Sequence, residues 1–261
     1  MFLSLWQCLL MGKLKYKFFR TFANFELPFS NRAVCSQMST HVRNIGDCDQ
    51  FSELNETWVF GYGSLVWKAD FPYEEKRTGY IKGFLRRFYQ NSIDHRGTHE
   101  KPGRVVTLIH SNDAEAKVWG MGYRIGKSNV TAVLSHLDYR EKNGYDRHRL
   151  LFYLYPPSDT QTNEPKNILL YLAKQENPSY AGQHDSLEKI AEQISEAAGE
   201  SGQNTEYVYK LADAMRQLYP GEEDDHLFSL EQILKSTEAR KNIRNATSSC
   251  DVDRANVCKE G

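Results

Sequence analysis

The sequence predicts an α+β fold, in which a curled antiparallel or mixed sheet comes first and most of the helices come last. Two observations support this fold class. Between residues 57 and 172 the chain consists mainly of short β-branched and aromatic runs, with only one helical segment among them. From residue 186 onward the apolar residues recur at helical spacing instead. A Rossmann fold would need strands and helices to alternate, so we favour the curled sheet.

Four strands are expected in the first half of the domain, because β-branched and aromatic residues gather there in short runs. They cover residues 58–67, 78–89, 104–109 and 117–125. The second strand is expected to be kinked at Gly83. In the fourth, large apolar residues alternate with Gly120 and Gly122, so the glycine face leaves room for another backbone or for a ligand.

The second half is expected to contain one early helix, two strands and three late helices. The early helix begins at a Ser128 cap and ends at residues 143–144, an Asn-Gly pair that favours the left-handed conformation of a helix end. The second of the late helices begins at a cap formed by Asn204 or Thr205. The two strands and the three amphipathic late helices cover residues 149–155, 167–172, 186–198, 205–218 and 226–235.

The chain divides into an extension at residues 1–56, a folded domain at residues 57–238 and a flexible tail at residues 239–261. Residues 2–11 are apolar but too few to span a bilayer, and basic residues follow them, which is the wrong order for a secretory signal. The extension is therefore either inert and disordered or a mitochondrial presequence, and we favour the first. The tail lacks an apolar face.

The composition excludes several classes of protein. Hydrophobic residues make up 40% of the chain and its formal net charge is −1, which is typical of a soluble globular protein and argues against a nucleic-acid or membrane surface as partner. All the cysteines lie close to one end of the chain or the other, at Cys8, Cys35, Cys48, Cys250 and Cys258. A disulfide framework, a thiolate zinc site and a cysteine nucleophile are therefore excluded from the core, and a reducing compartment fits.

The most unusual stretch is the bend Gly61-Tyr62-Gly63-Ser64, which separates two apolar runs. Two glycines between buried flanks let bare backbone approach a ligand closely, and successive N–H groups in such a bend can bind an anion. A dinucleotide fingerprint and a nucleophile elbow would both need glycine where the chain has Val66. The bend is therefore either an array of donors for a carboxylate or an oxyanion, or a simple β-bulge.

Glu141 is the most unusual single residue of the predicted early helix. It continues the stripe of apolar residues at positions 130, 134 and 137, so a carboxylate lies on the inward face. Near a helix C-terminus, burial and the helix dipole both raise the pKa of a carboxyl group, which suits a general base near neutral pH. Alternatively, Glu141 lies beyond the last packed turn and is frayed or paired with Arg140 or Arg147.

Other polar clusters allow more than one interpretation. Asp94, His95 and His99 have the spacing of metal ligands, but no matching cluster occurs elsewhere, so we favour solvated loop residues and expect no metal site. Two histidines, His136 and His148, lack an obvious acid–base partner. A group of arginines either pairs with an acidic ligand or faces solvent; its members are Arg86, Arg87 and Arg104.

Six motifs occur in order along the chain: VFGYGSLVWK at 59–68, DHRG at 94–97, PGRVVTL at 102–108, VWG at 118–120, LDYREK at 137–142 and GY at 144–145. Together with the helical stretches 188–194 and 202–207, they resemble the ChaC family of glutathione-specific γ-glutamylcyclotransferases. The resemblance spans residues 58–235, which makes it more specific than any single motif. It departs from the family pattern at Asn143, where relatives often have glycine, and both residues tolerate the left-handed conformation.

The resemblance implies a γ-glutamylcyclotransferase-like fold, a small β-barrel or curled mixed sheet surrounded by helices. It also implies a lyase that cleaves glutathione to 5-oxoproline and cysteinylglycine without a metal or a cofactor. Glu141 matches the catalytic glutamate of the family, and Tyr145 is expected either to orient Glu141 or to contact the substrate. The family's substrate-binding loop matches Val59, Phe60, Gly61, Tyr62, Gly63, Ser64 and Leu65.

Three functions follow as hypotheses: the glutathione-specific enzyme, a cyclotransferase for other γ-glutamyl amines, and a non-catalytic γ-glutamyl-binding protein on the same scaffold. The intact Glu141 and glycine bend argue against the last. We expect a monomer in the cytoplasm that takes part in glutathione catabolism, with glutathione as its partner, no nucleic-acid partner and no integral membrane segment.

Overall fold

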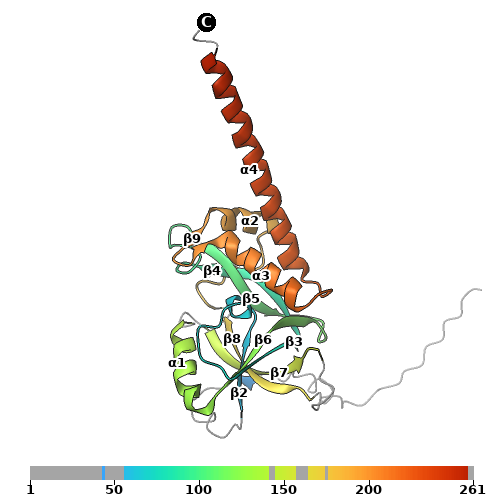
Figure 1. Ribbon diagram of the computed structural model, residues 1–261. Helices are drawn as coiled ribbons and strands as arrows, with labels where there is room; N and C mark the ends of the chain where they lie inside the picture. The colour runs from blue at the N-terminus through green and yellow to red at the C-terminus, as the bar shows by residue number, and fades with distance from the viewer. Residues whose placement is uncertain (1–42, 45–55, 141–144, 157–163, 174–175, 258–261) are drawn as a thin grey trace, which may run out of the picture. The chain divides into compact units, whose positions relative to one another are not determined.

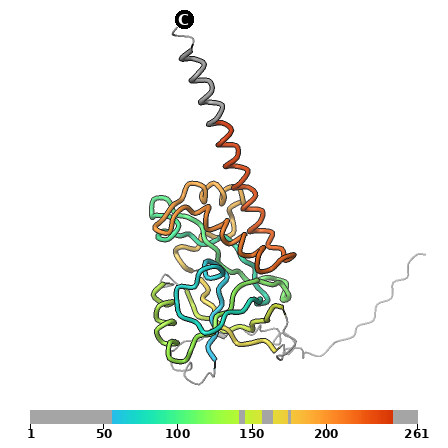
Figure 2. Tube along the Cα trace, in the orientation of Figure 1, coloured from blue at the N-terminus to red at the C-terminus, as the bar shows by residue number. Residues whose placement is uncertain are grey.

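The computed structural model describes residues 43–44, 56–140, 145–156, 164–173 and 176–257, with the backbone alone at 43–44 and 245–257 (Figure 1, Figure 2). Most of the extension predicted at residues 1–56 therefore lies outside the described residues, as do Glu141 and the helix end predicted at residues 143–144. Among the helices that are described, none combines the length and the apolar character that crossing a bilayer requires.

The main sheet closes into a barrel. Its strands run in the order β1-β7-β3-β6-β2-β8, and β7 also pairs with β8, which closes a ring of strands β7, β3, β6, β2 and β8. The pair β2–β8 is parallel and the other pairs are antiparallel, so the curled mixed sheet of the predicted α+β fold is confirmed. The strands are β1 (Arg43–Asn44), β2 (Thr57–Gly61), β3 (Glu75–Lys82), β6 (Lys117–Ile125), β7 (Tyr145–Leu154) and β8 (Lys166–Ala173).

Two further strands, β4 (Phe84–Ser92) and β5 (Gly103–His110), form a separate antiparallel hairpin. The single kinked strand predicted at residues 78–89 is therefore two strands, β3 and β4, which belong to different sheets. Gly83 separates them with a φ of +79°, in the left-handed region that glycine adopts without strain. The chain thus leaves the barrel at the residue where the sequence predicts a kink.

The helices divide between the barrel and the hairpin. The helix α1 (Val130–Arg140) lies against the barrel, whereas α2 (Leu187–Glu196), α3 (Asn204–Leu218) and the start of α4 (Asp225–Val257) gather beside β4 and β5 (Figure 1). The apolar stripe predicted for α1 is confirmed, because its buried residues share one hydrophobic cluster with strands β2, β6 and β8. These buried residues are Val133, Leu134 and Leu137.

The larger hydrophobic core joins the barrel to the late helices. Phe60 and Phe152 meet with their ring centroids 5.6 Å apart. A β-carbon on Gly120 would collide with the Phe60 ring and with the carbonyl oxygen of Gly61, so the space beside this glycine is filled by another backbone rather than by a ligand. Tyr219, just beyond α3, donates its hydroxyl proton to the carbonyl of Gly120 and thereby ties the helices to the barrel.

Three helix boundaries differ from those predicted. Ser128 lies inside a short 3-10 helix, η3 (Lys127–Asn129), and is not the cap of α1. Asn204 does not cap α3 with its side chain, because that amide accepts from the Arg104 N–H at 2.6 Å and donates to the Arg104 carbonyl at 2.9 Å. The helix α4 continues to Val257, where the sequence predicts a tail from residue 239. A short ladder of β9 (Ala198–Gly199) and β10 (Gly202–Gln203) joins α2 to α3.

Candidate active site

The glycine bend connects strand β2 to a short 3-10 helix, η2 (Ser64–Val66). The strand predicted to resume at residues 65–67 is therefore helical instead. A β-carbon on Gly61 would collide with the side chain of Leu65, which explains why the chain needs glycine at this turn. The first hydrogen bond of η2 joins the Val66 N–H to the Gly63 carbonyl at 3.0 Å, so the N–H groups of Ser64 and Leu65 have no acceptor within the helix.

The bend lies where the barrel meets the hairpin and α3. A β-carbon on Gly63 would stand 2.8 Å from the Tyr207 hydroxyl of α3 and 3.1 Å from Cγ2 of Val106 in β5. Immediately after η2, Trp67 contacts the Tyr207 ring edge-to-face with a centroid distance of 5.4 Å. The backbone at Gly63 can approach these elements this closely only because it carries no side chain.

Two tyrosine hydroxyls fasten the bend to the barrel. Tyr62 donates to the carbonyl of Tyr171 in β8 at 2.9 Å, and Tyr123 of β6 donates to the carbonyl of Leu65 at 2.6 Å. Burial raises the pKa of the Tyr123 hydroxyl, which keeps it a proton donor at neutral pH. The bend is therefore held from both sides by neutral hydrogen bonds.

The end of α1 is bonded to the same bend. Nη2 of Arg140 donates to Oγ of Ser64 at 2.6 Å, and Nη1 donates to both carboxylate oxygens of Asp70 at 3.1 Å. Burial alone would raise the pKa of the Asp70 carboxyl, but Arg140 and His136 outweigh it and lower that pKa. Asp70 is therefore an anion at neutral pH, and it holds the guanidinium group beside Ser64.

A second link runs from α1 through strand β8. The Tyr171 hydroxyl donates to Oδ1 of Asp138 at 2.8 Å, and Nε of Arg147 donates to the same oxygen at 2.9 Å. Burial, and then the bond to Asp138, raise the pKa of Tyr171. Because the carbonyl of Tyr171 also receives the Tyr62 hydroxyl, the last turns of α1 are joined to the bend by two separate routes.

Glu141, the predicted catalytic residue, lies outside the described residues, and so nothing in the structure tests its assignment. The residues that flank the undescribed segment 141–144 are described. Arg140, one peptide bond before Glu141, is hydrogen-bonded to the bend, and Tyr145 begins β7 as a partly buried residue opposite Ala173.

The predicted substrate-binding loop contains residues of two kinds. Val59 and Phe60 are buried, one in each hydrophobic cluster, so they support the loop from within the core. The residues that are partly exposed, and so accessible to a ligand with their side chains or N–H groups, are Gly63, Ser64 and Leu65. Gly61 and Tyr62 are buried and shape the bend from beneath.

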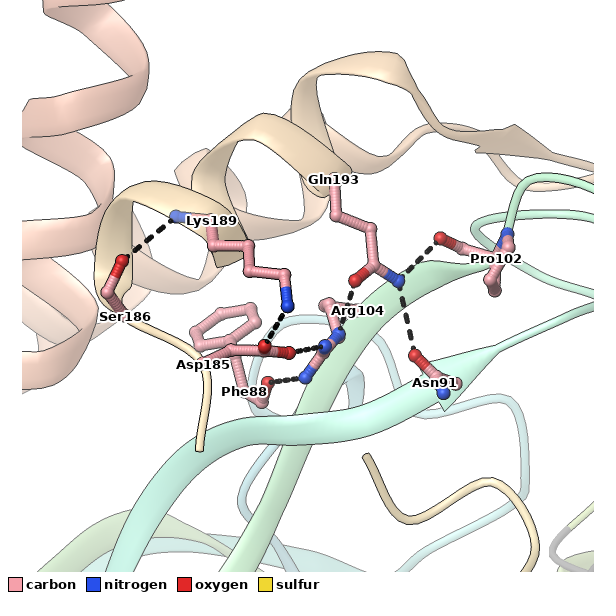
Figure 3. Close-up of polar contacts among 8 residues, drawn as sticks. All are labelled: Phe88, Asn91, Pro102, Arg104, Asp185, Ser186, Lys189 and Gln193. Carbon is pink, nitrogen blue, oxygen red and sulfur yellow. Dashed lines mark hydrogen bonds and ion pairs between the residues drawn. The ribbon is translucent and has the colours of Figure 1, made fainter. Parts of the chain in front are cut away.

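Two of the candidate arginines belong to internal ion pairs, which neither of the two interpretations of the sequence foresees. Arg86 is buried with Nη1 at 2.7 Å from the carboxylate of Asp224. Arg104 is also buried. Its Nη2 donates to a carboxylate oxygen of Asp185, and its Nε donates to Gln193 at 2.8 Å (Figure 3). Both arginines therefore fasten the hairpin to the late helices.

The residues considered as metal ligands are loop residues. The Asp94 carboxylate accepts from Oγ of Ser92 at 3.2 Å and from the N–H of His95 at 2.5 Å, and the Asp94 and His95 side chains are more than half exposed. In the part of the chain that the structure describes, no group of three or more His, Cys, Asp or Glu side chains could hold a metal ion. His136, for which the sequence shows no obvious acid–base partner, has one in the structure, because its Nε2 lies 3.4 Å from the Asp70 carboxylate.

Sequence reasoning missed the residues that position the bend, namely Asp70, Arg140, Tyr123, Asp138 and Tyr171. Each lies far along the chain from the residue it bonds; Arg140 and Ser64, for example, are 76 positions apart. Arg140 and Asp138 lie inside the LDYREK motif, so their place beside Glu141 was the one available signal.

The domain is similar in sequence to one protein family and to several of its characterised members. A family model described as ChaC-like protein matches residues 57–237. The chain is 43% identical over 182 residues to glutathione-specific gamma-glutamylcyclotransferase 1 of Danio rerio, covering 69% of this chain and 89% of the relative. It is 36% identical over 198 residues to the glutathione-specific gamma-glutamylcyclotransferase of Schizosaccharomyces pombe, covering 72% of this chain and 94% of that protein.

A solved structure has a similar fold. It is described as a crystal structure of a gamma-glutamyl cyclotransferase specific to glutathione from yeast, and it is 28% identical in sequence with a TM-score of 0.62. The alignment covers 70% of this chain and 99% of the yeast chain. The small closed barrel with helices beside it is therefore an arrangement that this chain shares with that protein.

Proposed function

The chain belongs to the ChaC-like family, as its motifs predict, and we propose that it is an enzyme that cleaves glutathione to 5-oxoproline and cysteinylglycine. The observation that carries this proposal is the match, at 36% to 43% identity, to relatives named as glutathione-specific cyclotransferases. The geometry adds support, because the two segments that carry the family's motifs, the bend and the end of α1, are hydrogen-bonded to each other.

The reaction needs no nucleophile from the protein, because the substrate carries its own. The α-amino nitrogen of the γ-glutamyl group attacks the γ-carbonyl carbon and closes a five-membered lactam. The amide bond to cysteine then breaks, and the proton lost by the attacking amine goes to the departing amine of cysteinylglycine. Oxidation states do not change, and no water is consumed. The protein must mainly fold the substrate for attack, and such orientation reaches effective molarities of about 10⁵–10⁸ M.

We assign the proton transfer to Glu141. A single carboxylate can take the proton from the ammonium group and return it to the leaving amine. The helix end and the apolar stripe that precede Glu141 both favour a raised carboxyl pKa, as this role needs. The hydrogen bond from Arg140, the residue before Glu141 in the sequence, to Ser64 of the bend supports this assignment.

The bend supplies hydrogen-bond donors for the substrate. The N–H groups of Ser64 and Leu65 lie before the first hydrogen bond of η2, and they are suited to the γ-carbonyl oxygen as negative charge develops on it. Val59, Phe60, Gly61 and Tyr62 contribute by holding this backbone in place. Tyr145, at the start of β7, is proposed to orient Glu141 or to contact the substrate.

A substrate comparison tests the proposal. The purified full-length chain is incubated separately with glutathione and with γ-glutamyl-alanine, and 5-oxoproline is quantified by mass spectrometry. We expect 5-oxoproline and cysteinylglycine in equal amounts from glutathione and little product from γ-glutamyl-alanine. Faster turnover of γ-glutamyl-alanine would assign the enzyme to other γ-glutamyl amines, and binding of glutathione without any product would indicate a non-catalytic binding protein.

We also propose that the protein is a monomer and acts in the cytoplasm. The placement of the cysteines outside the central domain supports a reducing compartment such as the cytoplasm. Light scattering of the purified chain tests the first, and fractionation of cells that express the full-length chain tests the second. A dimer in solution, or import into mitochondria, would contradict them.

A further inference from the structure

We propose that Arg140 is a positioning residue for the reaction and fixes the glycine bend in its active conformation through the side chain of Ser64. The inference rests on the proposed function and extends it. In the sequence, Arg140 stands out only as a possible partner of Glu141. The structure adds two partners, Ser64 and Asp70, and both belong to the segment that follows strand β2.

The guanidinium group of Arg140 is hydrogen-bonded to two residues of that segment. Nη2 donates to Oγ of Ser64 at 2.6 Å, and Nη1 lies 3.1 Å from each carboxylate oxygen of Asp70. Nε2 of His136, one helical turn earlier on α1, lies 3.4 Å from the same carboxylate. Asp70 therefore meets two residues on one face of α1, and the rigid fork of the arginine is aimed at Ser64.

The position of Ser64 explains why its side chain matters. Its carbonyl accepts from the N–H groups of Trp67 and Lys68 at 3.2 and 3.0 Å, so its backbone carries the start of η2. Its own N–H has no acceptor within η2. A charge-assisted hydrogen bond to Oγ restrains the side-chain rotamer and the peptide next to it, and it brings a positive charge close to the donors of the bend.

A second arginine provides a matched control. Arg124 in β6 also meets two carboxylates, with Nη1 at 2.6 Å from Glu74 and Nε at 3.0 Å from Glu75. Its side chain is 29% exposed, against 21% for Arg140. Among the described contacts of Arg124, none reaches the bend. Ion pairs this exposed contribute little to stability, so the two arginines should differ in their effect on catalysis rather than on folding.

The test is a double-mutant cycle on the full-length chain with glutathione as substrate. The variants are Arg140→Met, Ser64→Ala, the double variant and Arg124→Met, each measured for kcat, KM and thermal midpoint. We expect kcat/KM to fall about tenfold in each single variant at the bend, with kcat carrying the loss because the donors act mainly on the developing oxyanion. The double variant should be no slower than the slower single variant, because both changes remove one interaction. Arg124→Met should leave kcat and KM unchanged.

The opposite results would overturn the inference. Losses that multiply to about a hundredfold in the double variant would mean that Arg140 and Ser64 act independently. A kcat for Arg140→Met that equals that of Arg124→Met, or a loss that appears only in KM, would leave Arg140 as an ordinary ion pair. An inactive wild-type chain would overturn the proposed function and this inference together, whereas an active wild type with an unaffected Arg140→Met would overturn the inference alone.

Discussion

Two arginines bridge distant segments of this domain in different surroundings. Arg104 joins the β4–β5 hairpin to α2, its side chain is 5% exposed, and it is surrounded by internal partners (Figure 3). Arg140 joins α1 to the glycine bend, and its side chain is 21% exposed. A buried charge that loses its partner is costly, so the fold depends on the first network being complete. A partly exposed charge is screened by solvent, so the second network stabilises the fold little and instead sets the position of a bend that a ligand can reach.

The largest effect on catalysis is expected from Glu141→Gln, next to Arg140 in the sequence. Glutamine keeps the shape of the side chain but cannot carry a proton between the two amines, so turnover of glutathione should fall by about 10²- to 10⁴-fold. Thermal midpoint and glutathione binding should stay unchanged. Glu196→Gln, at the exposed C-terminal end of α2, is the matched control and should be fully active. Substantial activity in Glu141→Gln would remove Glu141 from the mechanism.

On the buried side, Arg104→Met should reduce stability and not catalysis. The change leaves the Phe88 carbonyl without this donor and the Asp185 carboxylate with Lys189 alone, and removal of one member of a buried pair costs about 3 kcal/mol. Urea unfolding measures the loss, and kcat/KM at a temperature where the variant is folded should equal that of the wild type. A stable variant, or one with lowered kcat, would mean that the two networks do not divide the roles as described.

The pH dependence of stability should also depend on a buried contact between the hairpin and the late helices. His226 of α4 accepts the Phe88 N–H at Nε2 with a distance of 3.1 Å, and burial, followed by the charge of Arg87, lowers its pKa from 6.5 to about 4. Between these two pH values the unfolded chain binds a proton that the folded chain does not, so about 3 kcal/mol of stability is lost as the pH falls from 6.5 to 4. His226→Gln should remove that part of the slope in urea unfolding between pH 7 and pH 4.5. An unchanged slope would contradict the assignment.

The smallest effect is expected from a chelator. The proposed reaction needs no Lewis acid, and Asp94 and His95 are exposed loop residues, so EDTA should leave the rate of glutathione cleavage unchanged. The rate is measured before and after dialysis against the chelator. A loss of activity that an added divalent metal restores would make the loop of Asp94, His95 and His99 a metal site after all.

Individual helices and turns could be predicted because buried side chains recur along a helix or strand at a fixed spacing in the sequence. The stripe that includes Leu134 and Leu137 indicates the buried face of α1, and Gly83 indicates the place where the chain changes direction. Strand partners could not be predicted, because the closure of the barrel through β7 and β8 depends on contacts between segments far apart in sequence. The same holds for Asn204, whose side chain bonds a strand rather than its own helix.

The candidate site could be predicted only in part for the same reason. The glycine bend stands out in the sequence because its composition departs from the apolar runs on either side. The Arg140–Ser64 bond and the tyrosines that fasten the bend do not, because tyrosines in strands and arginines in helices are common and their partners are set by the folded barrel. Chemistry can thus be read from a motif, whereas the residues that position the motif require coordinates.

The most direct test of the account is glutathione cleavage by the full-length chain in water enriched in oxygen-18. Attack by the substrate's own amine predicts that all γ-glutamyl product is 5-oxoproline and carries no label, with an equal amount of cysteinylglycine. Labelled glutamate as the product would mean that water attacks the γ-carbonyl and that the bend serves a hydrolase, which would contradict the central claim.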